Sequence, residues 1–323
     1  MKKLQNISEL LFKAMNYSAP EEIPVCFGFL PIAMKENGNQ IKKIMAKYPA
    51  FFGDDWMDYD YAQRLPFSYQ SGSFTDGWGC VWSNLSEGME SYVKGHPLPD
   101  RKDILSFHVP EEDLGLPHGF MYLRLLDLRG FEECMMDFAE ECDELQILID
   151  KVCNYNVRQM ELKCQHESSP ICWVGDDLGM QKGLAIGAEK WRKYLKPAFT
   201  KIYDVARQYG KQVLMHTDGD IIEIMPDLVE SGVKMLNPQF RANGIDCLVD
   251  TCKGKIPILL DLDRQLFPFG SPKDMRDHVR ETVEKMFLSQ GGLGINIEIG
   301  PDVSAENIEA LVDEMNQMRV YKG

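Results

Sequence analysis

The chain has 323 residues, of which 44% are hydrophobic and 26% are charged. This composition supplies enough apolar side chain for a buried core, so it excludes a disordered or fibrous protein. The 50 acidic residues outnumber the 35 Lys and Arg residues, giving a formal net charge of −15. Such a surface repels phosphate backbones and anionic lipid, so we expect no nucleic-acid partner and no membrane partner.

No apolar run approaches the ~20 residues that cross a bilayer. Glu9 and Lys13 interrupt the first apolar segment, so no secretory signal is predicted. The nine cysteines are scattered and include no Cys-x-x-Cys pair. This usage is typical of reduced, buried thiols and predicts a cytoplasmic protein.

Eight short apolar runs bounded by Gly, Pro or charged residues predict strands. They cover residues 23–28, 74–82, 121–128, 171–176, 212–216, 233–236, 256–262 and 292–298.

Helical patterns separate the later strands. Apolar side chains recur with the 3.6-residue period over residues 189–209, and Pro197 should kink this helix or split it in two. Ser271 followed by Pro272 marks the start of a second helix, and Ser304 the start of the last one.

Alternating strands and helices predict a parallel sheet, because parallel neighbours need crossover connections. At this length we expect a single α/β domain over residues 1–323, closed into a (β/α)8 TIM barrel with an N-terminal elaboration at about 49–113 that covers the barrel mouth. An open doubly wound sheet is the alternative. Its dinucleotide-binding form lacks support, because no Gly-x-Gly-x-x-Gly turn follows an early strand.

Catalytic groups of such barrels project from the carboxyl ends of the strands. Polar side chains do collect at the predicted strand ends. They are Asp76, Asp176, Asp177, His216, Asp218, Asn237, Asp261, Asp263, Gln265 and Glu298.

The sharpest local feature is His216-x-Asp218. Residues two apart on an extended strand point to the same side, so the imidazole and the carboxylate can converge on one zinc ion. Glu298, at the end of the last strand, is the predicted third ligand. In the alternative, Asp218 caps a helix that starts near Asp220, Gly219 makes the turn and His216 belongs to the core.

Asp176, Asp177 and Gln181 follow another predicted strand and could orient a substrate or transfer protons. The alternative is a helix N-terminus stabilised by acidic side chains. The segment from Asp261 to Gln265 poses the same choice, with Arg264 paired to a neighbouring carboxylate. The remaining histidines are expected in loops or on helix exteriors, without a role. They are His96, His108, His118, His166 and His278.

Several motifs occur together along the chain. They are DDLG-x-Q-x-G at 176–183, WRKYLKP at 191–197, H-x-DG at 216–219, the segment from DL at 227–228 to NP at 237–238, D-x-Q at 263–265, and GG at 291–292 followed by PDV-x-x-ENI at 301–308. With these motifs the chain resembles the uroporphyrinogen decarboxylase superfamily over nearly its whole length. DGWGCVW at 76–82 and HPL at 96–98 are similar to its corrinoid-dependent methyltransferase branch. The resemblance implies the (β/α)8 barrel.

True decarboxylases of this superfamily carry an N-terminal arginine-rich motif that grips the carboxylates of uroporphyrinogen. Here the first arginine is Arg64, so decarboxylation of that porphyrin precursor is not expected. The methyltransferase branch holds zinc with a His-x-Cys pair and a later Cys. His216 matches the histidine, Asp218 stands where the first Cys would be, and Glu298 falls near the second. Carboxylate ligands leave a harder ion, which suits polarisation of an ether or alcohol oxygen.

The resemblance therefore implies a methyltransferase that acts between a small methylated molecule, for example a methyl ether, and a corrinoid protein. The chain has no Asp-x-His-x-x-Gly motif, so we expect the corrinoid on a partner protein. His216, Asp218 and Glu298 would hold zinc, and His216, Asp218 and Asp76 would be catalytic. The side chains predicted to line the substrate pocket are Asp176, Asp177, Gln181, Gln265 and Asn237.

Two alternatives stay open at this point. One is a metal-free decarboxylase or other lyase on a small carboxylated substrate, with Asp76 and His216 as acid and base. The other is a barrel without catalytic activity that serves as a binding module.

Overall fold

The computed structural model describes residues 6–60 and 65–323, so Arg64 lies outside the described residues. The chain folds into two compact units, each assembled from separate stretches of sequence. Unit 1 comprises Met1–Gly72, Asn84–Ser91 and Gln239–Gly323, and unit 2 comprises Ser73–Ser83 and Tyr92–Pro238.

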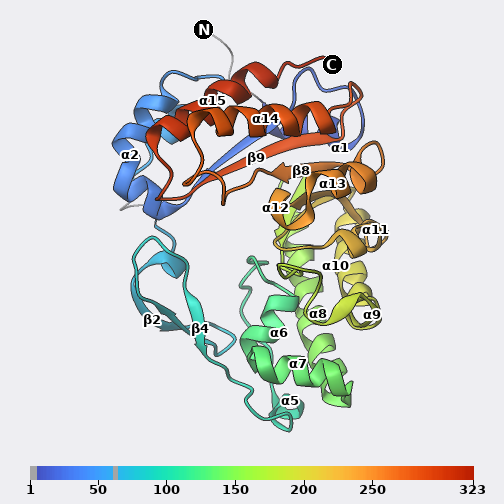
Figure 1. The fold of residues 1–323 in the computed structure, drawn as a ribbon. Helices are drawn as coiled ribbons and strands as arrows, with labels where there is room; N and C mark the ends of the chain where they lie inside the picture. Colours follow the sequence, from blue (N-terminus) through green and yellow to red (C-terminus); the bar gives the residue numbers. More distant parts are fainter. Residues whose placement is uncertain (1–5, 61–64) are drawn as a thin grey trace. The chain divides into compact units, whose positions relative to one another are not determined.

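Unit 1 contains three parallel strands in the order β1-β9-β8, with β1 spanning Val25–Phe29, β9 Leu293–Ile299 and β8 Ile258–Asp261. Helices α14 and α15 run side by side in this unit (Figure 1). The helices of unit 1 are α1 Ile7–Met15, α2 Pro31–Met45, α3 Asp54–Met57, η1 Phe67–Tyr69, α12 Phe240–Asn243, α13 Ile245–Cys252, α14 Pro272–Met286 and α15 Ala305–Met318.

The predicted helix starts in unit 1 are confirmed. The Ser271 hydroxyl accepts a hydrogen bond from the Asp274 backbone N–H, and the Asp274 carboxylate accepts one from the Ser271 N–H, which forms a capping box. The Ser304 hydroxyl accepts from the Asn307 N–H at the start of α15. Serine caps therefore satisfy amide groups that the first turn of a helix leaves without partners.

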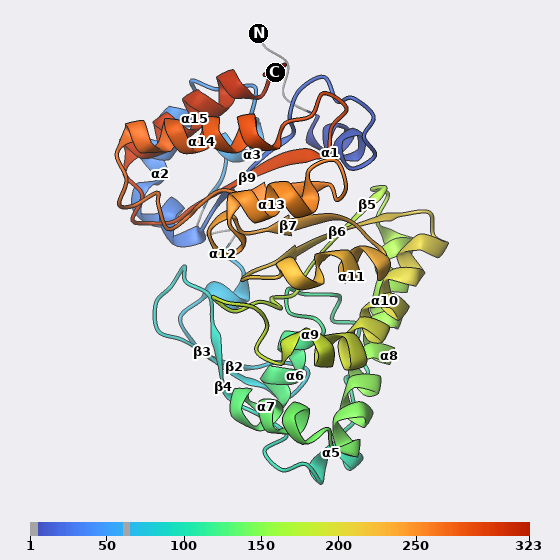
Figure 2. The same cartoon turned by 45° about the vertical axis from the view of Figure 1, so that its right-hand side comes forward.

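Unit 2 contains three parallel strands in the order β7-β6-β5, with β7 spanning Val233–Pro238, β6 Gln212–Thr217 and β5 Ile171–Gly175. The long helices α8 and α10 pack together (Figure 2). Their buried apolar side chains form the core with those of the strands. The helices of unit 2 are α5 Asp103–Ser106, α6 Tyr122–Arg129, α7 Phe131–Glu140, α8 Asp143–His166, α9 Gly187–Lys190, η2 Trp191–Leu195, α10 Lys196–Gln208, η3 Ile222–Ile224 and α11 Met225–Glu230.

The helix predicted over 189–209 is split, as its proline suggested. A π-helical turn, η2, separates α9 from α10, and Pro197 lies in the first turn of α10. A proline at that position loses no intrahelical hydrogen bond, because the first amides of a helix have no partner within it. The wider π turn accommodates the change between the two helices.

Six of the eight predicted strands are confirmed as β1, β5, β6, β7, β8 and β9. The prediction at 74–82 is wrong for a barrel strand: β2 (Gly72–Thr75), β3 (Val81–Asn84) and β4 (Tyr92–Gly95) form a separate three-stranded sheet, in which β3 and β4 are antiparallel. The prediction at 121–128 is also wrong, since this segment forms α6. The described residues thus show an α/β fold with parallel strands, without confirming closure into eight.

The segment 121–128 shows why the hydrophobic pattern alone does not distinguish a strand from a helix here. In residues 121–128 all side chains but those of Arg124 and Asp127 are apolar, and such short runs fit a buried strand or a buried helix equally well. The carboxylate of Asp176, which is distant in sequence, accepts hydrogen bonds from the first N–H groups of α6 and stabilises the helix. No helix in the described part of the chain is both long enough and apolar enough to cross a bilayer.

Candidate functional site

The ends of β5 and β6 are joined by a close backbone contact. The Leu178 N–H donates to the Thr217 hydroxyl at 3.0 Å, and the Gly179 N–H donates to the Asp218 carbonyl at 3.1 Å. A Cβ on Gly219 would lie 2.2 Å from the Gly179 carbonyl carbon, and Gly219 has a φ of +84°. Glycine is therefore required here, both for the close approach and for the backbone conformation.

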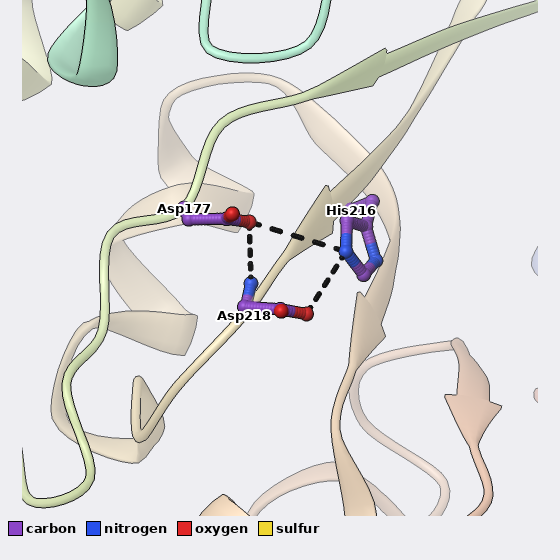
Figure 3. A group of neighbouring side chains, drawn as sticks. All are labelled: Asp177, His216 and Asp218. Atoms are coloured by element: carbon purple, nitrogen blue, oxygen red, sulfur yellow. Dashed lines mark hydrogen bonds and ion pairs between the residues drawn. The ribbon is translucent and has the colours of Figure 1, made fainter. Parts of the chain in front are cut away.

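This contact brings three ligand-bearing side chains together (Figure 3). The His216 Nε2 lies 3.1 Å from an Asp218 Oδ1 and 3.9 Å from Asp177 Oδ1. The Asp218 backbone N–H donates to the same Asp177 oxygen at 2.9 Å. All three ligand atoms lie within 4.8 Å of one another, and all three residues belong to unit 2.

Asn237, at the end of β7, orients the imidazole. Its Oδ1 lies 3.0 Å from the His216 Nδ1 and accepts a hydrogen bond from that nitrogen, because an amide oxygen cannot donate. The His216 Nε2 then faces two carboxylates. A carboxylate oxygen and an imidazole lone pair repel each other, so this arrangement suits either a shared proton or a metal ion between them.

His118 also belongs to this group of side chains. Its Nε2 lies 3.0 Å from Asp177 Oδ2, and its ring centroid lies 5.6 Å from that of His216. Burial opposes a positive charge on His118, but the hydrogen bond and the charge of Asp177 outweigh it and raise the His118 pKa above its ordinary value. Burial likewise works against ionisation of Asp177, yet His118 and the Asp218 N–H hold the Asp177 pKa below its ordinary value. His118 lies in a connection, as predicted, and it contacts these side chains, although the sequence indicates no role for it.

Asp176 has a different environment from its neighbour Asp177. It is 0% exposed, and its two oxygens accept hydrogen bonds from the N–H groups of Met121, Tyr122 and Leu123 at 2.6–3.0 Å. Burial raises the pKa of Asp176 to about 6. Asp176 therefore stabilises a helix N-terminus, that of α6, which precedes β5 in the chain. An enclosed carboxylate offers no surface to a substrate, which contradicts the predicted substrate contact of Asp176.

Asp76 holds a turn in place. One oxygen accepts hydrogen bonds from the Trp78 and Cys80 N–H groups, and the other accepts from the Trp82 indole and the Arg124 guanidinium, all at 2.9 Å. Arg124 is itself buried. Four donors occupy this carboxylate, so the geometry assigns Asp76 to the structure of the turn and does not support the predicted catalytic role.

Asp220 also holds the connection after β6: its carboxylate accepts hydrogen bonds from the Ile222 N–H at 3.3 Å and from the Gly183 N–H at 3.0 Å. Gln181 lies in the same connection and is exposed, so its predicted contact with substrate stays a prediction.

The predicted residues of unit 1 face other partners. Glu298 forms an ion pair with Arg264, Asp263 pairs with Arg241, and Asp261 accepts a hydrogen bond from the Asn296 amide at 2.6 Å. Gln265 is exposed. Glu298 and His216 belong to different units, so their joint coordination of a metal stays a prediction.

A second histidine also departs from expectation. His278 on α14 is buried, and its Nε2 accepts a hydrogen bond from the Asp263 N–H at 3.0 Å. Burial lowers the pKa of His278, which favours the neutral ring that this acceptor role requires. All nine cysteines lie within the described residues, and none of them forms a disulfide bond.

The model of the family "Uroporphyrinogen decarboxylase (URO-D)" matches residues 125–318, which is more than half of the chain. The chain belongs to this family. The matched segment contains Asp177, His216 and Asp218, but not His118.

Among solved structures, a methyltransferase from Methanosarcina mazei is similar over 98% of this chain and 99% of its own, with a TM-score of 0.67 and 15% sequence identity. At that identity the likeness shows the fold. A dihydropteroate synthase from Xanthomonas albilineans is similar over 49% of this chain and 58% of its own, with a TM-score of 0.34 and 16% identity, which is too weak to carry an argument. No curated protein matches the chain.

Proposed function

We propose that this chain is a zinc-assisted methyltransferase that moves a methyl group between a small methylated substrate, such as a methyl ether, and a corrinoid protein. The observation that carries the proposal is the convergence of Asp177, His216 and Asp218 at the ends of β5 and β6. Membership of the URO-D family and the likeness in fold to a methyltransferase support it.

The donor set fits zinc. Imidazole nitrogen and carboxylate oxygen are ordinary zinc ligands, and ligand atoms bound tetrahedrally at ~2.1 Å lie about 3.4 Å apart. The two separations from the His216 Nε2, 3.1 Å and 3.9 Å, fall on either side of that value. Asn237 fixes the tautomer that leaves Nε2 available, as expected for a metal-bound histidine. Three protein ligands are also the usual number in catalytic zinc sites.

In this proposal His216, Asp218 and Asp177 hold the metal, which would supply Lewis-acid polarisation of the substrate oxygen. Asp177 is the third ligand within unit 2, and the variant Glu298→Gln tests the prediction that Glu298 is a ligand. Asn237 orients His216, and His118 holds the outer oxygen of Asp177. The corrinoid comes on a partner protein, because the chain lacks the corrinoid-binding motif. The free cysteines favour a reducing, cytoplasmic location.

The decarboxylase or lyase alternative needs Asp76 and His216 as an acid and base pair. The Asp76 carboxylate already accepts four hydrogen bonds from the turn and from Arg124, which leaves it poorly suited to proton transfer. The structure therefore favours the methyltransferase over this alternative.

The test combines zinc-loaded protein, a panel of methyl ethers and free cobalamin reduced to the cobalt(I) state. We expect a matched rise of methylcobalamin, followed by absorbance, and of the demethylated alcohol, followed by chromatography. His216→Ala should lose bound zinc and lower the rate about 10³-fold, because metal polarisation is worth several kcal/mol.

His108→Ala is the matched control, since His108 is an exposed histidine of the same unit. It should retain both zinc and rate. Equal zinc content in the His216→Ala variant and the unsubstituted protein would contradict the metal site. Release of carbon dioxide from a carboxylated substrate in the presence of chelator would instead support the lyase.

A further inference from the structure

His118 reaches the site from a segment far away in the sequence. It precedes α6, whereas the three residues of the proposed metal site lie at the ends of β5 and β6. The Nε2 of His118 contacts Asp177 Oδ2, the oxygen on the far side of that carboxylate from His216. The nearer oxygen, Oδ1, accepts the Asp218 N–H. Both oxygens of Asp177 are therefore held, each by a different donor.

The backbone around His118 is built for this contact. The Gly119 N–H donates to the Gly175 carbonyl at 2.8 Å, which attaches the segment to the end of β5. A Cβ on Gly175 would lie 2.4 Å from the His118 Nδ1, so the imidazole packs directly on the strand where a side chain is missing. Gly119 has a φ of +76°, a conformation that glycine adopts without strain.

Asp176 fixes the other end of the same segment. Its carboxylate accepts hydrogen bonds from the N–H groups of Met121, Tyr122 and Leu123, which begin two residues after Gly119. The consecutive carboxylates of Asp176 and Asp177 thus hold the segment at two points, one through the backbone and one through His118. This arrangement leaves His118 little freedom to move away from Asp177.

We infer that His118 is a positioning residue for Asp177: its ring N–H fixes the carboxylate so that Oδ1 faces the His216 Nε2 and completes the metal site. This inference rests on the proposed function and deepens it. Partners that orient a ligand from behind commonly contribute 10–100-fold to metal affinity, because a ligand that is already oriented loses less freedom on binding.

The experiment measures zinc affinity by competition with a chromophoric chelator in the full chain and three variants. His118→Phe keeps the ring but removes the donor, and we expect a loss of affinity of about 10–100-fold. His118→Gln places an amide N–H near the position of Nε2 and should recover most of the affinity. His108→Phe, the matched control on an exposed histidine, should bind zinc as the unsubstituted chain does.

A loss of the same size in His118→Phe and His118→Gln would indicate a general effect on folding rather than donation to Asp177, and would overturn the inference. So would unchanged affinity in both. Thermal unfolding of each apo variant separates the two effects, because the inference predicts a larger difference in zinc affinity than in stability. Failure of the unsubstituted chain to bind zinc would contradict the proposed metal site itself, and it would be seen before the variants are compared.

Discussion

The strand ends of the two units carry the same kinds of side chain but hold them differently. In unit 1 the carboxylates of Glu298 and Asp263 pair with arginines. In unit 2 the carboxylates of Asp177 and Asp218 lie near the His216 Nε2. The other ring nitrogen of His216 is hydrogen-bonded to Asn237. A guanidinium stays protonated and cannot bind a metal ion, whereas a neutral imidazole can bind one together with the carboxylates. The partner of an acidic residue, more than its place at a strand end, therefore indicates which set can bind a cation.

The strongest test of this comparison exchanges one carboxylate in each unit. Asp218→Asn should reduce zinc affinity by at least 10²-fold and the methyl-transfer rate by about 10³-fold, because it removes a charged ligand. Glu298→Gln should change both by less than about 10-fold, because Arg264 holds this carboxylate in unit 1. Zinc affinity is measured by chelator competition. A loss in Glu298→Gln as large as that in Asp218→Asn would show that Glu298 is a ligand and would remove the contrast between the units.

A second test concerns the backbone contact that joins the strand ends in unit 2. Gly219→Ala should lower the free energy of unfolding by about 3 kcal/mol, from the left-handed backbone and the clash with Gly179 together. Gly183→Ala is the matched control, with a φ of +61° and open space around the added methyl group. It should cost about 1 kcal/mol. Urea unfolding followed by circular dichroism measures both, and equal losses would contradict the role given to the close contact.

Asp76 sharpens the comparison from within unit 2, because it resembles the arginine-paired acids of unit 1. Asp76→Asn should lower the free energy of unfolding by about 2 kcal/mol, since its new amide group cannot accept from Arg124 and the Trp82 indole. Zinc affinity should stay unchanged. A variant of normal stability whose methyl-transfer rate falls would instead restore the catalytic role predicted for Asp76.

The smallest expected effect is a pH dependence at Asp127, whose carboxylate lies 3.6 Å from the Arg124 guanidinium that also binds Asp76. Burial raises the pKa of Asp127 to about 6, from an ordinary value of 3.8. The folded state therefore binds this proton more tightly, so the contribution of Asp127 to stability is fully present below pH 3.8 and is lost as the pH rises through about 6. Between pH 7 and pH 5 the unsubstituted chain should gain about 1 kcal/mol relative to Asp127→Asn, measured by urea unfolding at both values.

Asp274→Asn serves as the control for that measurement. The Ser271 hydroxyl and N–H lower the Asp274 pKa, so its contribution is lost only as the pH falls below the ordinary range of a carboxyl group. Its difference from the unsubstituted chain should stay constant between pH 7 and pH 5. A constant difference for Asp127→Asn as well would contradict the raised pKa.

Local sequence patterns predicted the parts of the fold that local physics determines. The six parallel strands, the Ser271 cap and the break at Pro197 all follow from periodicity, capping and the geometry of proline. The segment 121–128 did not follow, because its helical state depends on Asp176, about fifty residues away. A single sequence does not reveal such long-range hydrogen bonds.

The residues of the candidate site likewise divide into those that local sequence patterns indicate and those that depend on long-range contacts. His216-x-Asp218 could be found from the spacing alone, because both residues lie at the end of one strand. The position of Asp177 after a strand predicts a place in the site, but as a residue that lines the substrate pocket and not as a metal ligand. His118 gave no signal, because it lies in an irregular connection without periodicity. Only the glycines at 119 and 175 mark the close packing there, and their meaning depends on a contact that the structure reveals.

One peptide bond separates Asp176, which caps α6, from Asp177, which faces the site. A ligand that restricts the motion of Asp177 therefore also restricts the motion of Asp176. The N–H groups of Met121, Tyr122 and Leu123 all donate hydrogen bonds to the Asp176 carboxylate. Exchange of these three amides with deuterium should therefore slow when the site is filled. The chain thus contains its own reporter of occupancy, readable by mass spectrometry without a label and before any substrate is known.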